Sequence, residues 1–350
     1  MTTDRAPIFL ICSERSGSNL ISAMMGAHPL VYAHPPYHLG RDLLLNLSRC
    51  MASGPKGTAW EALIAHAVDK VASYRSPEEA AKLKVWLSSQ ETIDPAAIAR
   101  FIWQQMPEGA EGKHVFVKEN NIHHLIAFLV TAFPDAKFVY QVRDPRDFLA
   151  SAKARRKQWM GNKFGSLRRA LTVWREDQEG GLTALALLGP ERVCLLRYED
   201  LVADARTQLE RICRFVGLDF DPSMLSFHEG AEAKKVASTT GARENVAKPL
   251  MTSNFRKYRA QLSRGEIRIT EAWLGDIMMQ LGYPCDFSRK EGRPSIWLSL
   301  RPQISEFWER LSNGEVYPFY KHGHRKLTRA LDSEIVPMLP PIPDKSDRSK

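Results

Sequence analysis

The residues best suited to chemistry in this sequence lie in one short loop near its start. An apolar run ends at Cys12 and another begins at Leu20, and the residues between them are small or polar. Such a loop lets several backbone N–H groups point at one anion, and the start of the following helix adds partial positive charge. Arg15 can donate two hydrogen bonds to a phosphate. The residues expected to contact the anion are Arg15, Ser16, Gly17, Ser18 and Asn19.

This loop differs from the phosphate loop of ordinary nucleotide triphosphatases. It lacks the first glycine and the Lys-Ser/Thr pair that hold the β- and γ-phosphates and magnesium. An ATP-hydrolysing enzyme is therefore disfavoured. A plain helix start capped by a serine accounts for the same residues, so the loop alone leaves both interpretations open.

Most of the positive charge of the chain lies in one segment. The net charge is +9, and residues 143–175 contain ten Lys and Arg residues against only Asp144 and Asp147. A run of charge usually forms a solvated helix face. It also fits a site for nucleic acid, acidic lipid or a nucleotide with several phosphates. Charge alone does not choose among these.

Alternating apolar runs and helical patterns predict the elements that position these residues. Short apolar runs predict buried strands, and the segments between them predict helices. Such βα alternation indicates an α/β fold with a central parallel sheet flanked by helices on both faces. The expected strands are 8–12, 115–117, 137–142 and 192–198; the expected helices are 20–26, 122–133, 204–216 and 269–281, with a helical insertion at about 40–112.

Composition limits the class of protein. The chain has 350 residues, of which 44% are hydrophobic and 25% charged, which is ordinary for a globular protein. We expect one domain over residues 1–336 and a disordered, proline-rich tail at 337–350. No apolar run approaches the ~18 residues of a transmembrane helix, and residues 1–7 do not resemble a secretory signal. Five scattered cysteines without a CxxC pair indicate a cytoplasmic protein and argue against structural zinc.

Three motifs resemble those of sulfotransferases that use PAPS (3′-phosphoadenosine 5′-phosphosulfate). The loop Arg15–Leu20, followed by Ala27-His28-Pro29, resembles the family's 5′-phosphosulfate loop. The segment Val142–Asp147, with Ser151 after it, resembles the strand and helix that bind the 3′-phosphate. A weaker match is Leu196–Leu201, which resembles the family's RYEDL strand end. The motifs occur in the family's order and cover residues 8–220, with a loose extension to 255–258.

The resemblance implies a P-loop-like sulfotransferase fold and in-line transfer of a sulfuryl group from PAPS to an acceptor hydroxyl or amine. It assigns Arg143 and Ser151 to the 3′-phosphate, and Tyr198 and Lys257 to the nucleotide. This chemistry requires no metal. The expected acceptors are small molecules, sugars, lipids or natural-product intermediates, and no nucleic-acid partner is expected.

The same resemblance suggests catalytic residues. Arg15 and Lys118 are candidates to stabilise the charge of the transition state. Many relatives carry a glutamate base after the first helix, but this chain has no carboxylate between His28 and Asp42. A histidine suits the task because its ordinary pKa lies near neutrality. The favoured base is His38 in the segment Pro35–Leu39, the second choice is His34, and weaker candidates are His123, His124 and Glu119.

Two other functions stay open. A P-loop-type kinase or other phosphotransferase would use a similar loop, although the missing lysine disfavours it. A protein that binds a nucleotide or another anion without catalysis would also fit the basic segment, and the missing glutamate allows a sulfotransferase-like protein without turnover. Three motifs in order favour the sulfotransferase.

Overall fold

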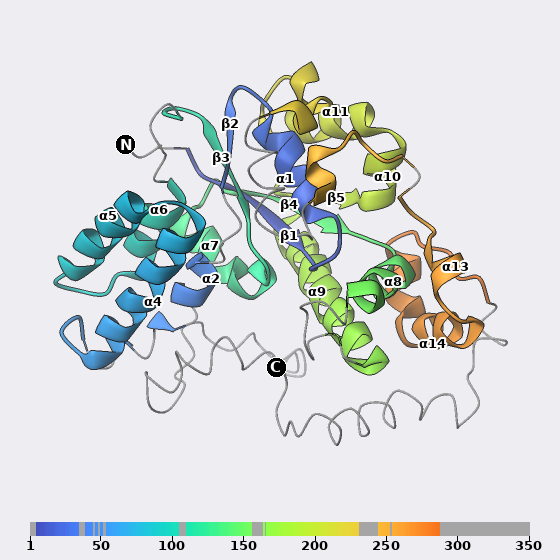
Figure 1. Cartoon of the computed structure of the whole chain (residues 1–350), viewed down its shortest axis with the longest axis horizontal. Helices are drawn as coiled ribbons and strands as arrows, with labels where there is room; N and C mark the ends of the chain where they lie inside the picture. The colour runs from blue at the N-terminus through green and yellow to red at the C-terminus, as the bar shows by residue number, and fades with distance from the viewer. Residues whose placement is uncertain are drawn as a thin grey trace, which may run out of the picture.

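A parallel five-stranded sheet forms the centre of the described fold (Figure 1). The computed structural model describes residues 5–34, 39–44, 46–47, 50–51, 54–104, 110–155, 164, 166–230, 244–252 and 254–287. The strand order is β2-β3-β1-β4-β5, and every pairing is parallel. This confirms the predicted α/β class. The strands are β1 Ile8–Cys12, β2 Val31–His34, β3 His114–Lys118, β4 Lys137–Val142 and β5 Val193–Arg197.

The strand order places a crevice at the end of β1. From β1 the chain passes to β2 and β3 on one side, and then crosses to β4 and β5 on the other. In parallel α/β sheets, ligands bind at the carboxyl ends of the strands where the order reverses in this way. The polar loop after Cys12 leaves the sheet at this point, so the topology sets it at the favoured position for a ligand.

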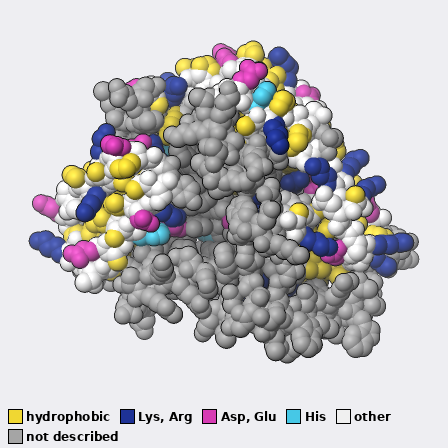
Figure 2. Space-filling view, in the orientation of Figure 1, with side chains coloured by type: hydrophobic (Ala, Val, Ile, Leu, Met, Phe, Trp, Pro, Cys, Tyr) yellow, Lys and Arg dark blue, Asp and Glu magenta, His cyan; other side chains and the backbone are white. Residues whose placement is uncertain are grey.

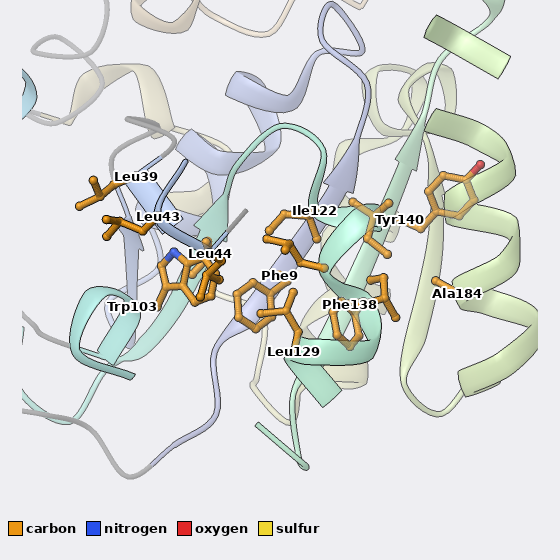
Figure 3. Close-up of a cluster of buried hydrophobic side chains, with 14 of the residues drawn as sticks. Phe9, Leu39, Leu43, Leu44, Trp103, Ile122, Leu129, Phe138, Tyr140 and Ala184 are labelled. Atoms are coloured by element: carbon orange, nitrogen blue, oxygen red, sulfur yellow. The ribbon is translucent and has the colours of Figure 1, made fainter. Parts of the chain in front are cut away.

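The central strands β1, β3 and β4 bury both of their faces. In β1, Phe9 and Ile11 belong to one hydrophobic cluster, whereas Ile8 and Leu10 belong to the other. This alternation follows from the two-residue period of a strand. Figure 3 shows the first cluster, in which Phe9 lies beside Trp103, with ring centroids 5.1 Å apart. Fully buried strands explain why these segments are continuous apolar runs in the sequence.

Helices cover the sheet on both faces (Figure 1). One face is covered mainly by α1, α10 and α11, the other by α7 and α9, and α8, α13 and α14 pack beyond α9. Their bounds are α1 Ser18–Gly26, α7 Ile126–Ala132, α8 Pro145–Arg155, α9 Leu167–Leu188, α10 Tyr198–Ala203, α11 Ala205–Val216, α13 Tyr258–Gln261 and α14 Arg264–Gln280. Short 3₁₀ helices are η1 Ile122–Leu125, η2 Pro222–Met224, η3 Phe227–Glu229 and η4 Glu244–Ala247.

The segment between β2 and β3 is helical in its described part and lies at one side of the sheet (Figure 1). The Ser76 hydroxyl accepts a hydrogen bond from the Glu79 backbone N–H at 3.2 Å, which caps the second long helix. The edge strand β2 that precedes this segment was not predicted. The helices are α2 Leu39–Leu44, α4 Thr58–Tyr74, α5 Pro77–Ser88 and α6 Pro95–Gln104.

One helix boundary differs from the prediction. Helix α14 begins at Arg264, ahead of the predicted start at residue 269, because Ser263 and Glu266 form a capping box. The expected tail at 337–350 lies outside the described residues.

Across the part of the chain that the structure describes, no helix is both long and apolar enough to cross a lipid bilayer.

Candidate functional site

The loop after β1 has the backbone shape of an anion site. Arg15 and Gly17 both adopt left-handed backbone conformations, with φ of 65° and 87°. The Ser16 hydroxyl donates to the Ser13 carbonyl at 2.7 Å, which closes the turn. A Cβ atom on Gly17 would lie 2.3 Å from the ring of Tyr198. Glycine is therefore required here both by the backbone and by the close approach of the ring.

A pocket opens beside this loop. Its polar wall contains Arg15, Gly17, Ser18 and Asn19 from the loop and the start of α1. The Asn19 Oδ1 atom is buried without a hydrogen-bond partner. Such orphaned polar atoms are rare in folded proteins, and a bound ligand is one way to satisfy them. The remaining wall is formed by Leu20, Arg143, Tyr198, Phe227, Val246, Pro249, Leu250, Met251 and Asn254.

Arg143 enters this pocket from the end of β4. It is only 8% exposed, and its guanidinium lies 4.6 Å from the centre of the Tyr198 ring. Its Nη1 donates to the Arg15 carbonyl at 3.1 Å, while its Nε is buried without a partner. Arg15 in turn donates from Nε to the Ser151 hydroxyl at 3.1 Å. The structure thus brings together four predicted nucleotide residues from the first, second and third motifs.

The lining of the pocket also includes a residue that the sequence analysis missed. Asn254 donates from Nδ2 to the Tyr198 hydroxyl at 2.7 Å, and its carbonyl accepts from Arg143 Nη2 at 3.4 Å. Burial raises the pKa of Tyr198, so this hydroxyl stays protonated. Lys257 follows on the same segment with an exposed side chain. The FRKY resemblance at 255–258 pointed to this segment but not to Asn254 itself.

Basic side chains are exposed on the side of the molecule where α8, α13 and α14 lie (Figure 2). Not all of the basic segment is a solvated face, because Arg143 and Arg146 are buried. Of these two buried arginines, Arg143 lines the pocket, whereas Arg146 pairs with Asp144 and Glu271. The exposed basic residues on α8, α13 and α14 and on the segment before α13 include Lys153, Arg256, Lys257, Arg259 and Arg264.

The end of β3 contributes two buried charged residues. Lys118 is 6% exposed and pairs in register with Leu10 of β1. Burial raises the pKa of the neighbouring Cys12 thiol to about 11, although the charge of Lys118 opposes this rise. Cys12 is therefore a neutral thiol rather than a nucleophile. Glu119 accepts a hydrogen bond from the Gly40 backbone N–H at 3.1 Å, which makes it the cap of α2.

The structure describes only one of the two favoured base candidates. His34 ends β2, is 1% exposed, and places Nε2 3.2 Å from the Ile102 carbonyl. If Nε2–H donates to that carbonyl, only Nδ1 can accept a proton. Its strand neighbour across the ladder is Val117, next to Lys118. His38 lies outside the described residues.

A second cavity, of about 350 Å³, also borders the loop. Its lining includes Glu14, whereas the next residue, Arg15, lines the first pocket. Asn120 donates from Nδ2 to Glu14 Oε1 at 2.7 Å. His123 places Nδ1 3.7 Å from Asp177 Oδ1, and burial lowers the pKa of His123 to about 3, so its ring is neutral. Among the described residues, no cluster of three or more His, Cys, Asp or Glu side chains could hold a metal ion.

Comparison with known proteins shows the family. Residues 7–222 match the sulfotransferase family, and the chain belongs to it. Protein-tyrosine sulfotransferase of Drosophila melanogaster is 23% identical over 305 residues, which cover 83% of this chain and 54% of that protein. The chain thus spans about half the length of that relative. Carbohydrate sulfotransferase 5 of Mus musculus is 24% identical over 361 residues, covering 90% of each.

Solved structures support the fold. The sulfotransferase domain from the curacin biosynthetic pathway superposes with a TM-score of 0.58 at 20% identity, covering 81% of this chain and 99% of that domain. The sulfotransferase domain of the Synechococcus PCC 7002 olefin synthase gives a TM-score of 0.54 at 22% identity, covering 90% and 97%. The predicted sulfotransferase fold is confirmed.

Proposed function

We propose that this protein transfers a sulfuryl group from PAPS to a hydroxyl or amine of a small-molecule, sugar, lipid or natural-product acceptor. The observation that carries the proposal is the convergence of two anion-binding elements on one pocket. The loop at Arg15 and Gly17 forms one of them, and Arg143 forms the other; Ser151 adjoins the loop through its hydrogen bond from Arg15. A nucleotide with phosphates at both its 5′ and 3′ positions requires two such sites.

The residues of the pocket fit this nucleotide. The left-handed loop and the start of α1 suit the 5′-phosphosulfate, and the unpartnered Nε of Arg143 suits the 3′-phosphate. The apolar wall at Phe227 and Leu250 suits the flat face of adenine. ATP has no 3′-phosphate, so it would leave the Arg143 side of the pocket unused.

PAPS, when bound, supplies an activated sulfuryl group whose transfer leaves a phosphate. Arg15 and Lys118 then stabilise the negative charge that develops on the transferred group and on that phosphate. His38, or His34 in its place, takes the proton of the acceptor hydroxyl. The cavity beyond Glu14 receives the acceptor, because adjoining residues of one loop line both cavities.

Turnover of PAPS tests this proposal. The protein is incubated with PAPS and a mixed panel of phenols, amino sugars, oligosaccharides and lipid alcohols, and products are detected by mass spectrometry. We expect an acceptor-dependent sulfonated product and release of PAP (3′,5′-adenosine bisphosphate). Incubation of the same panel with ATP is the control. Transfer of phosphate from ATP would instead establish a phosphotransferase.

Replacing His38 with alanine should lower turnover by about 100-fold or more, because loss of a general base typically has this effect. PAP affinity should change little, since the residue is assigned to the acceptor and not to the nucleotide. Steady-state kinetics and calorimetric titration with PAP measure the two effects. His66→Ala on α4 is the matched control and should leave both unchanged. Full activity of His38→Ala would show that the base is another group.

Replacing Gly17 with alanine should weaken PAP binding and lower the free energy of unfolding by about 2 kcal/mol, from the left-handed backbone and the contact with Tyr198. Gly217→Ala separates these causes. Gly217 has a similar φ of 83°, but a Cβ atom added there would have no neighbour within 4 Å. This control should lose stability only, and an equal loss of PAP affinity in both variants would contradict the role of Gly17.

A further inference from the structure

A buried carboxylate on α8 holds the backbone of a distant segment. Asp147 is 2% exposed and lies in the first turn of α8. Its Oδ2 accepts from the Arg256 backbone N–H at 2.5 Å, and its Oδ1 accepts from the Tyr258 backbone N–H at 2.9 Å. One side chain thus holds the backbone N–H groups of two residues, Arg256 and Tyr258, in a segment more than a hundred residues later in the chain. We call residues 254–258 the strap.

The strap has a conformation that needs support. Arg256 has a φ of 56°, a left-handed conformation that side chains other than glycine disfavour. Its side chain is exposed, and its backbone N–H donates a hydrogen bond to Asp147 of α8. The hydrogen bonds to Asp147 therefore hold the strap at the residue where its backbone is least favourable.

The strap also touches the nucleotide pocket at its start. Asn254 contacts both Arg143 and Tyr198, as described above. Lys257 lies between the two peptide groups that Asp147 holds, and its side chain is exposed. Asp147 is thus linked through the strap backbone to the residues assigned to the 3′-phosphate. Burial raises the pKa of Asp147, while the Tyr258 N–H and the charge of Arg143 lower it.

We propose that Asp147 is a positioning residue that shapes the strap into one wall of the 3′-phosphate site, and so sets the preference of the pocket for nucleotides with a 3′-phosphate. The inference rests on the proposed function, because it presumes that the pocket binds PAPS. It assigns to the second acid of the Arg-Asp-Pro-Arg-Asp motif a role in recognition through the strap, without contact with the nucleotide.

The test compares two nucleotides that differ only in the 3′-phosphate. PAP and 5′-AMP are titrated by calorimetry into the full chain and into Asp147→Asn. The amide replaces one acceptor oxygen by a donor, so it cannot accept both N–H groups. We expect PAP affinity to fall about tenfold, as for loss of a hydrogen bond to a charged group, while 5′-AMP affinity falls less than about twofold.

A control variant separates this effect from a general loss of stability. Ile212→Val on α11 is the control, because Ile212 is fully buried in the cluster on the other side of the sheet. This variant should melt at a lower temperature and keep the wild-type ratio of PAP to 5′-AMP affinity. A change of the ratio in the control would show that general loosening, rather than the strap, determines the preference.

A second pair of variants reaches the same contact from the strap. Arg256→Pro and Arg256→Gly both remove the guanidinium, but proline also removes the N–H that Asp147 accepts and cannot adopt the positive φ of Arg256, so it breaks the strap conformation that this bond holds. Glycine adopts the positive φ freely. We expect the ratio of PAP to 5′-AMP affinity to fall in Arg256→Pro relative to Arg256→Gly. If Asp147→Asn does not fold, this pair still tests whether the strap conformation held by Asp147 determines the preference.

The outcomes separate the two proposals. Failure of the wild-type protein to bind PAP would overturn the proposed function. Wild-type binding of PAP with an unchanged ratio in Asp147→Asn, or with equal ratios in the two Arg256 variants, would overturn the role of Asp147 alone. A lowered ratio in Asp147→Asn, together with a lower ratio in Arg256→Pro than in Arg256→Gly and the wild-type ratio in Ile212→Val, supports it.

Discussion

Arg143→Ala is expected to weaken PAP binding by about 100-fold and to weaken 5′-AMP binding much less. The guanidinium is nearly buried, and its Nε faces the pocket region without a protein partner. Two charge-assisted hydrogen bonds to a phosphate in such a place contribute about 3 kcal/mol, which is about two powers of ten in affinity. Calorimetric titration of the variant with both nucleotides measures the change.

Arg15→Ala is the matched comparison for this prediction. Arg15 belongs to the loop assigned to the 5′ end of the nucleotide, and both PAP and 5′-AMP carry a 5′-phosphate. The loss of affinity should therefore be similar for the two ligands. A loss confined to PAP in Arg15→Ala, or one shared equally by both nucleotides in Arg143→Ala, would reverse the assignment of the two anion sites.

The second large effect concerns stability. Arg146→Met is expected to lower the free energy of unfolding by about 3–5 kcal/mol, as measured by urea denaturation. The guanidinium side chain is 3% exposed and contacts Asp144 at 2.7 Å and Glu271 at 2.6 Å. Burial alone would lower the pKa of Arg146, but the hydrogen bonds and charge of Asp144 raise it above its ordinary value. Removing the cation leaves two buried carboxylates without their partner.

An exposed arginine provides the control. Arg206 forms a pair with Glu210 at 3.4 Å, with side chains 58% and 41% exposed. Arg206→Met should change the free energy of unfolding by less than about 1 kcal/mol. Equal losses in the two arginine variants would mean that the buried network contributes no more than an ordinary surface pair.

Much of the fold could be predicted because its central strands are buried on both faces. Continuous apolar runs such as Ile8–Cys12 and Lys137–Val142 have clear ends, and the structure places strands at these same residues. The edge strand Val31–His34 escaped prediction because it has only four residues and its middle two are half-buried. It therefore lacks the apolar run that marks the central strands.

The site residues also divide into those that could be predicted from the sequence and those that could not. Arg15 and Gly17 lie in a loop whose pattern indicates anion binding, and the resemblance to sulfotransferases pointed to Arg143 and Ser151. The structure places Arg15, Gly17 and Arg143 in one pocket, with Ser151 hydrogen-bonded to Arg15. The contacts of Asn254 and Asp147 join segments more than a hundred residues apart. No local pattern encodes such pairing, because it depends on how α8 and the strap pack after folding.

The most direct test of the central claim is calorimetric titration of the wild-type protein with PAP, 5′-AMP and ATP under one set of conditions. The two-site pocket predicts that PAP binds at least about tenfold more tightly than either other nucleotide, because PAP alone has phosphates at both positions in this arrangement. Tighter binding of ATP, or no binding of PAP, would contradict the account.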